Sequence, residues 1–159
     1  MVEKINDIKK EKRKLVTLII TKDDPRKLRD VLLSIENNNL LSKSEILILD
    51  NSNKNKNRLK NSKLALRLKK NKIIYINKIH WEKIKEIFCS KIKERKISNI
   101  LKNIELGTRD WDTHNARNAG ATLCSLLYKY SDIILSLDDD MIIPKNFYLN
   151  TNKVNYPRG

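Results

Sequence analysis

The fold follows from one stretch of the chain, residues 15–25, which read LVTLIITKDDP. Its first six residues are apolar or β-branched, the pattern of a strand buried on both faces of a parallel sheet. We expect this strand to stop at Thr21, in a polar turn. Asp24 is placed to cap a following helix and Pro25 to occupy its first position. The stretch therefore predicts a buried strand that leads directly into a helix.

A predicted helix and a second predicted strand are separated by a polar break at residues 37–39. The helix is expected to run from Pro25 to about Asn37, with one apolar face. Residues 45–50, which read EILILD, predict a second buried strand ending in a polar turn. A strand, a helix and a strand in this order predict a parallel sheet. The apolar face of the helix is formed by Leu28, Val31, Leu32 and Ile35.

The remaining elements are predicted from apolar periodicity. We expect a loop at 51–59, a short helix at 62–70, a third strand at 73–76, a basic amphipathic helical stretch at 79–104, and a fourth strand at 133–137. A further helix begins at Thr113 or His114 and ends before Ser131. Its apolar face contains Ala116, Ala119, Leu123, Leu127 and Tyr130. The sequence therefore predicts an α/β fold with a mostly parallel sheet flanked by helices.

Length and composition predict one folded domain. The chain has 159 residues, of which 40% are hydrophobic and 33% charged, a balance typical of globular proteins. No apolar run approaches the roughly 20 residues of a membrane-spanning helix, and residues 1–14 lack a secretory pattern. We therefore expect a cytoplasmic protein. Cys89 and Cys124 lack metal-ligand spacing and are expected to be buried thiols, with neither a disulfide nor a zinc site.

The net charge of +15 favours association with nucleic acid, anionic lipid or phosphorylated ligands. The lysines are spread through residues 9–14, 54–72 and 78–102. The sign of the charge does not choose among these three classes of partner.

Three consecutive carboxylates, Asp138, Asp139 and Asp140, follow the predicted fourth strand. Like charges held this close repel each other, and a divalent cation relieves the repulsion. Mg²⁺ and Mn²⁺ prefer oxygen ligands and commonly share them with a substrate phosphate. In an extended backbone, Asp138 and Asp140 would point to the same side and share an ion. The alternative is a solvated acidic turn in which Asp140 serves as a cap.

The polar ends of three strands are expected to face one crevice. Residues 21–24, 50–52 and 138–140 each follow a predicted parallel strand, and ligands bind beyond the carboxyl ends of such strands. Asp50 is a candidate acceptor for a nucleobase N–H or a ribose hydroxyl. Its alternative role is an Asx turn with Asn51 and Ser52.

Four segments together resemble family 2 glycosyltransferases, which have the GT-A fold. Residues 16–23 (VTLIITKD) are similar to the family's opening strand and Thr-x-Asn loop. Residues 45–52 (EILILDNS) are similar to its second strand and turn. Residues 115–120 (NARNAG) look like its Ala-Arg-Asn-x-Gly helix, and residues 135–140 (LSLDDD) like its Asp-x-Asp strand end. The ordered set covers residues 15–147.

The resemblance implies a metal-dependent glycosyltransferase that moves a sugar from a UDP- or GDP-sugar to an unknown acceptor, which is a glycan, a lipid-linked molecule or a protein. It implies Mn²⁺ or Mg²⁺ as the cofactor, held by Asp138 and Asp140. Arg117 is a candidate partner for phosphate or for an aspartate. The implied nucleotide-sugar-binding residues are Thr21, Asp23, Asp50, Asn51, Arg117, Asp138 and Asp139.

The chain also departs from the family pattern. Lys22 and Asp23 stand where the family has an aromatic residue and Asn, and no residue is assignable as the catalytic base. Asp110 and Asp112 lie in the wrong part of the pattern for that role. The expected organisation is a basic lead-in at 1–14, a GT-A-like domain at 15–150 with a basic helical insertion at about 78–112, and a tail at 151–159. The GT-A pattern is thus expected to be truncated after the Asp-x-Asp strand.

The competing hypothesis is a non-catalytic basic module or a degenerate transferase fragment. Such a module would bind nucleic acid or an anionic membrane through residues 78–102, and its binding would weaken steeply with salt. A basic helix that holds a transferase peripherally at a membrane would combine both hypotheses. For the transferase itself, nucleic acid is not an expected partner.

Overall fold

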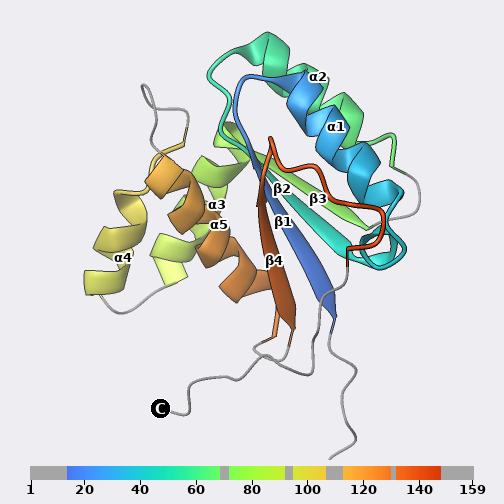
Figure 1. Ribbon diagram of the computed structural model, residues 1–159. Helices are drawn as coiled ribbons and strands as arrows, with labels where there is room; N and C mark the ends of the chain where they lie inside the picture. Colours follow the sequence, from blue (N-terminus) through green and yellow to red (C-terminus); the bar gives the residue numbers. More distant parts are fainter. Residues whose placement is uncertain (1–13, 69–71, 92–94, 107–112, 130–131, 148–159) are drawn as a thin grey trace, which may run out of the picture.

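The computed structural model describes residues 14–68, 72–91, 95–106, 113–129 and 132–147 (Figure 1). Its centre is a four-stranded, all-parallel sheet with strand order β3-β2-β1-β4. This confirms the predicted α/β fold with a parallel sheet. The predicted tail and nearly all of the predicted lead-in lie outside the described residues. The strands are β1 (Leu15–Thr21), β2 (Glu45–Asp50), β3 (Ile73–Asn77) and β4 (Ile133–Asp138).

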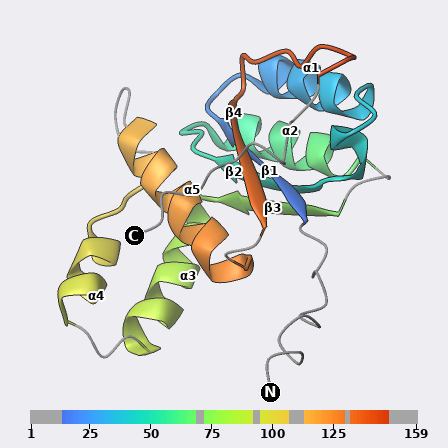
Figure 2. The same ribbon diagram turned by 60° about the horizontal axis from the view of Figure 1, so that its bottom comes forward.

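Helices cover both faces of the sheet, as Figures 1 and 2 show from two directions. On one face lie α1 (Pro25–Glu36) and α2 (Asn55–Ala65). On the other lie α3 (Lys78–Lys91), α4 (Arg95–Lys102) and α5 (Thr113–Leu127). A short 3-10 helix, η1 (Leu41–Lys43), precedes β2. Among the described helices, none is both long and apolar enough to cross a membrane.

Each face of the sheet has its own apolar core, because side chains of a strand alternate between the two faces. Leu18 and Leu49 face α3, α4 and α5, whereas Ile19 and Ile48 face α1 and α2. The helices contribute buried residues to the two cores: Trp81, Leu101, Ala116, Ala119, Leu123 and Cys124 on the first face, and Leu28, Val31, Leu32, Ile35 and Ala65 on the second.

Helix α1 begins as the sequence predicts. The Asp24 side chain accepts hydrogen bonds from the backbone N–H groups of Arg26 and Lys27, at 3.0 and 3.5 Å, and Pro25 is the first helical residue. These bonds satisfy backbone donors that the first turn of a helix leaves unpaired. The polar turn after β1 is therefore held in place by the helix that follows it.

Helix α2 was predicted wrongly at its start. The sequence indicated a loop to residue 59 and a helix from residue 62, but α2 begins at Asn55. Its buried residues are only Asn61 and Ala65. A helix with so little apolar periodicity carries no sequence signal that separates it from a polar loop.

The other helical predictions need smaller corrections. The basic stretch at 79–104 forms two helices, α3 and α4, and residues 92–94 between them lie outside the described part. Leu127 was predicted on the apolar face of α5 but is 48% exposed. Cys124 was not assigned to that face, but it is buried in the core. Tyr130 of the predicted face lies outside the described residues. Both cysteines are free thiols, as predicted, although Cys89 is only partly buried.

Candidate functional site

The carboxyl ends of β1, β2 and β4 lie side by side, as predicted. Strand β1 lies between the other two, and the register pairs Thr21 with Asp50 and Ile20 with Asp138. The strand order also reverses at β1, because β2 and β3 follow on one side of it and β4 on the other. Ligands of open α/β sheets bind beyond the strand ends near such a reversal. We define the strand-end site as residues 21–24, 50–52 and 138–140, with Arg117 of α5.

The ends of β1 and β4 are joined through Asp139. Its Oδ2 atom accepts a hydrogen bond from the Thr21 hydroxyl at 2.8 Å and from the Lys22 backbone N–H at 3.1 Å. Burial raises the pKa of Asp139, and the Asp140 carboxylate adds to the rise. The two hydrogen bonds and Lys27 act in the opposite direction without cancelling it. Asp139 thus fixes the acidic turn against the loop after β1.

Asp138 faces a different element from Asp139. The Arg117 guanidinium lies 3.1 Å from Asp138 Oδ2, and the two side chains are 56% and 48% exposed. Helix α5 therefore presents a cation to the carboxyl end of β4, where Arg117 pairs with an aspartate. A pair this exposed contributes little to stability and leaves both groups open to solvent.

The backbone after Asp138 corrects one expectation. Strand β4 ends at Asp138, and Asp139 and Asp140 form a turn in which the Met141 N–H bonds to the Asp138 carbonyl at 3.2 Å. Asp140 therefore lies beyond the strand. The prediction that Asp138 and Asp140 share an ion from the same side of an extended backbone was wrong in its backbone geometry. Asp140 is exposed at the tip of the turn.

Within the described residues, no three side chains of His, Cys, Asp or Glu gather as a metal site. A divalent ion that shares its ligands with a diphosphate and water takes only one or two protein carboxylates. Asp138 and Asp140 supply hard oxygen donors of this kind, and both are open to solvent. The donor set therefore fits Mg²⁺ or Mn²⁺ in the presence of a phosphate ligand.

Asp50 has no exposed surface. Its Oδ1 atom accepts the Ser52 backbone N–H at 2.8 Å, which is the Asx turn that the sequence left open as an alternative. Its Oδ2 atom accepts bonds from Asn61 Nδ2 at 2.9 Å and from the Tyr75 hydroxyl. Burial raises the pKa of Tyr75, and so does the Asp50 carboxylate. Contact between Asp50 and a ligand would require this network to open.

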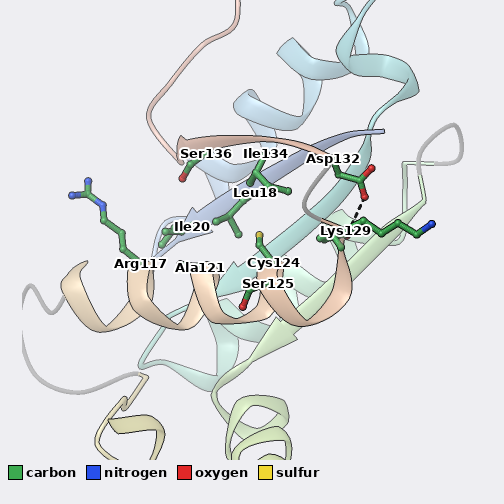
Figure 3. Close-up of a pocket in the computed structure, with 11 residues that line it drawn as sticks. Leu18, Ile20, Arg117, Ala121, Cys124, Ser125, Lys129, Asp132, Ile134 and Ser136 are labelled. Atoms are coloured by element: carbon green, nitrogen blue, oxygen red, sulfur yellow. Dashed lines mark hydrogen bonds between the residues drawn. The ribbon is translucent and has the colours of Figure 1, made fainter. Parts of the chain in front are cut away.

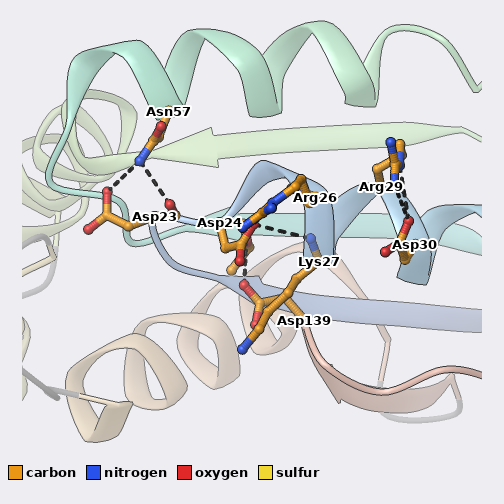
Figure 4. Close-up of polar contacts among 9 residues, drawn as sticks. Asp23, Asp24, Arg26, Lys27, Arg29, Asp30, Asn57 and Asp139 are labelled. Atoms are coloured by element: carbon orange, nitrogen blue, oxygen red, sulfur yellow. Dashed lines mark hydrogen bonds and ion pairs between the residues drawn. The ribbon is translucent and has the colours of Figure 1, made fainter.

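Asp23 joins the loop after β1 to the start of α2 (Figure 4). Its carboxylate accepts bonds from the backbone N–H groups of Asn53 and Lys54, at 3.3 and 3.2 Å, and from Asn57 Nδ2 at 3.2 Å. Burial alone would raise the pKa of Asp23, but these hydrogen bonds and the Lys54 charge outweigh it and lower the pKa.

The backbone of Asp23 is also unusual, with a φ of 54°. This left-handed conformation is uncommon outside glycine, although Asp and Asn adopt it more readily than other residues. It is accompanied by a bond from the Asp23 N–H to Ser52 Oγ at 2.8 Å. The neighbouring Asn51 is buried, and its N–H bonds to the Thr21 carbonyl at 2.8 Å. The loops after β1 and β2 therefore behave as one hydrogen-bonded unit.

A hollow of about 490 Å³ lies beside the strand-end site, between α5 and strands β1 and β4 (Figure 3). Leu18, Ile20, Cys124 and Ile134 give it a mainly apolar lining. Arg117 stands at one end of the hollow and is the one residue that it shares with the strand-end site. The hollow thus extends from Arg117 along β4, which is an edge strand of the sheet.

Two residues of the Asp50 network, Asn61 and Tyr75, were not predicted from the sequence. Asn61 falls between the predicted loop at 51–59 and the predicted helix at 62–70, and Tyr75 was read only as a strand residue. Both act on Asp50 from 11 and 25 residues away. No local pattern reports a contact of this kind.

Comparison of the chain with family models, curated proteins and solved structures found no match. The resemblance to family 2 glycosyltransferases therefore rests on the four sequence segments alone.

Proposed function

We propose that the strand-end site binds the diphosphate of a nucleotide sugar, and that the chain is the donor-binding part of a GT-A-type glycosyltransferase. The observation that carries the proposal is the acidic turn at the carboxyl end of β4. Asp139 is anchored to Thr21 at 2.8 Å, while Asp138 and Asp140 remain accessible beside the cation of Arg117. Accessible carboxylates and an arginine at one strand end suit a metal-bound diphosphate.

The residues take distinct roles in this proposal. Asp138 and Asp140 would hold Mg²⁺ or Mn²⁺, which would serve as a Lewis acid for the departing nucleoside diphosphate. Arg117 would bind a phosphate oxygen, since guanidinium groups form bidentate bonds to phosphate. Asp139 would hold the turn in position through Thr21 and Lys22.

The nucleoside would lie against the unit formed by the loops after β1 and β2. Asp23 and Asp50 use their carboxylates to hold this unit together, through Lys54 N–H and Ser52 N–H respectively. We therefore assign both of them to positioning Thr21 and Asn51. A direct bond from Asp50 to a base remains a prediction that requires displacement of Tyr75 or Asn61.

The test is calorimetric titration of UDP and of GDP into the full chain, with and without Mn²⁺. Binding that requires Mn²⁺ and is lost in Asp138→Asn/Asp140→Asn supports the proposal, because these substitutions keep the shape of the side chains and remove their charge. The control is Asp30→Asn, which removes a carboxylate that pairs with Arg29 on α1. Equal binding by the double variant and the wild type would contradict the proposed metal role.

A further inference from the structure

A second surface, distinct from the strand-end site, is concentrated on α2. Residues 51–68 contain six Lys or Arg and no Asp or Glu. Lys60, Lys63 and Arg67 are exposed, and within the described part of the chain none of them forms an ion pair. Their charges are therefore available to a partner.

The cations of α2 adjoin those of α1. An open groove of about 250 Å³ between the two helices is lined by Arg26 and Arg29 of α1 and by Lys60, Lys63 and Arg67. The α1 arginines pair with Asp24 and Asp30, at 3.6 and 2.9 Å, so α1 adds little net charge. Figure 2 shows both helices on the face of the sheet opposite α3, α4 and α5. The groove is thus a positive surface whose net charge comes from α2.

Two exposed leucines lie on this surface. Leu59 is 56% exposed, and Leu66, which directly follows α2, is 83% exposed. Leu59, Lys63 and Leu66 are spaced four and three residues apart, so they belong to one side of the helix. Exposed leucines beside lysines combine an apolar area that a membrane interface can bury with charges that anionic lipid attracts.

We propose that the α2 surface, defined as Leu59, Lys60, Lys63, Leu66 and Arg67, docks the chain on an anionic lipid bilayer. The lysines would be attracted to the negative surface potential, and the two leucines would enter the boundary between headgroups and acyl chains. The inference is independent of the proposed sugar-nucleotide site and involves none of its residues. It also differs from the membrane contact expected at residues 78–102, where Glu82 and Glu86 interrupt the positive charge and Lys85 is paired with Glu82.

Nucleic acid fits this surface less well. Phosphate contacts would use the lysines but not the exposed leucines, and single-stranded nucleic acid is bound by stacking on aromatic side chains. Neither α1 nor α2 contains an aromatic residue. Substitution of the leucines should therefore weaken binding to a membrane but not binding to nucleic acid.

The experiment is flotation of the full chain with vesicles of phosphatidylcholine alone or mixed with phosphatidylglycerol. We expect binding only to the anionic vesicles. Lys60→Ala/Lys63→Ala/Arg67→Ala should weaken the partitioning on the order of 100-fold, from three lost charges. Leu59→Ser/Leu66→Ser should weaken it by about tenfold or more. All five side chains are exposed, so the fold should be retained, and circular dichroism checks this.

The matched control is Lys83→Ala/Lys91→Ala/Lys96→Ala, which removes the same charge from exposed positions on α3 and α4. It should bind vesicles nearly as the wild type does. The proposal is overturned if the wild type ignores anionic vesicles, or if the control loses as much binding as the α2 charge variant. It is also overturned if the leucine variant binds vesicles like the wild type. In that case an RNA oligonucleotide bound through Lys60, Lys63 and Arg67 would identify nucleic acid as the partner.

Discussion

The Thr21 hydroxyl donates a hydrogen bond to Asp139 Oδ2 at 2.8 Å, across 118 residues of chain. The bond joins the carboxyl end of the first strand to the turn after the fourth. Because Asp139 is turned inward by it, the carboxylates on either side, Asp138 and Asp140, remain accessible. The proposed site depends on this division of roles among three adjacent aspartates.

Asp139 and Asp23 should change the free energy of unfolding in opposite directions as the pH rises. The raised pKa of Asp139 means that the folded chain binds this proton more tightly, so its contribution is present at acid pH and is lost as the pH rises through the raised value. The lowered pKa of Asp23 means that its contribution is present above the usual aspartate range and is lost as the pH falls through the lowered value.

The measurement is urea unfolding of Asp139→Asn and Asp23→Asn from about pH 3 to about pH 7, where aspartates titrate. Relative to the wild type, Asp139→Asn should become more stable as the pH rises, and Asp23→Asn should become less stable. A change in the same direction for both variants would show that burial does not dominate at Asp139, or that the hydrogen bonds do not dominate at Asp23.

Tyr75→Phe should lower the free energy of unfolding by about 2 kcal/mol, because it removes a donor from the buried Asp50 carboxylate. Tyr128→Phe is the matched control. The Tyr128 hydroxyl is buried and has no partner among the described residues. Its removal should cost nothing or stabilise the fold. Thermal and chemical unfolding measure both variants, and equal losses would show that the Asp50 network has no special role.

Arg117→Ala should separate binding from stability. The pair with Asp138 is exposed, so its loss should change the free energy of unfolding by less than about 1 kcal/mol. Affinity for UDP or GDP with Mn²⁺ should fall about tenfold or more, since a charge-assisted bond to phosphate is lost. Arg29→Ala removes a comparably exposed arginine, paired with Asp30, and should leave affinity unchanged. Unchanged affinity in Arg117→Ala would remove this arginine from the proposed site.

The two thiols should differ in reactivity. Burial raises the pKa of Cys124, which decreases the thiolate available for disulfide exchange. A Cys89→Ser variant, which keeps only Cys124, should react with an aromatic disulfide reagent more slowly than a Cys124→Ser variant. In urea the two rates should converge. A fast native reaction at Cys124 would show that α5 does not pack against β1 as described.

The strands were predictable because each is rich in apolar and β-branched residues, and their parallel arrangement followed from the intervening helices. The residues 45–50 are an example: the predicted and observed bounds of β2 coincide. The start of α1 was equally predictable, since its cap is local to Asp24 and Pro25. Adjacent strand ends then brought Thr21, Asp50 and Asp138 together.

What the sequence did not show depends on contacts between distant residues. Asn61 and Tyr75 reach Asp50 from separate elements, and their convergence leaves Asp50 with no exposed surface. Strand alternation separated Asp139 from Asp138 and Asp140, but it did not show which groups hold Asp139: its hydrogen bonds come from the Thr21 hydroxyl and the Lys22 N–H, 118 and 117 residues away. Helix α2 carried too little apolar periodicity to be placed, although it supplies both Asn61 and the basic surface.

The most direct test of the central claim is a ¹H–¹⁵N correlation spectrum of the labelled chain during titration with UDP or GDP and Mg²⁺, followed by a trace of Mn²⁺. We expect changes in the amide chemical shifts of residues 21–24, 51–53 and 138–141, and paramagnetic broadening by Mn²⁺ centred on Asp138 and Asp140. Shifts confined to α2, or no shifts with either nucleotide, would contradict a sugar-nucleotide site at the strand ends.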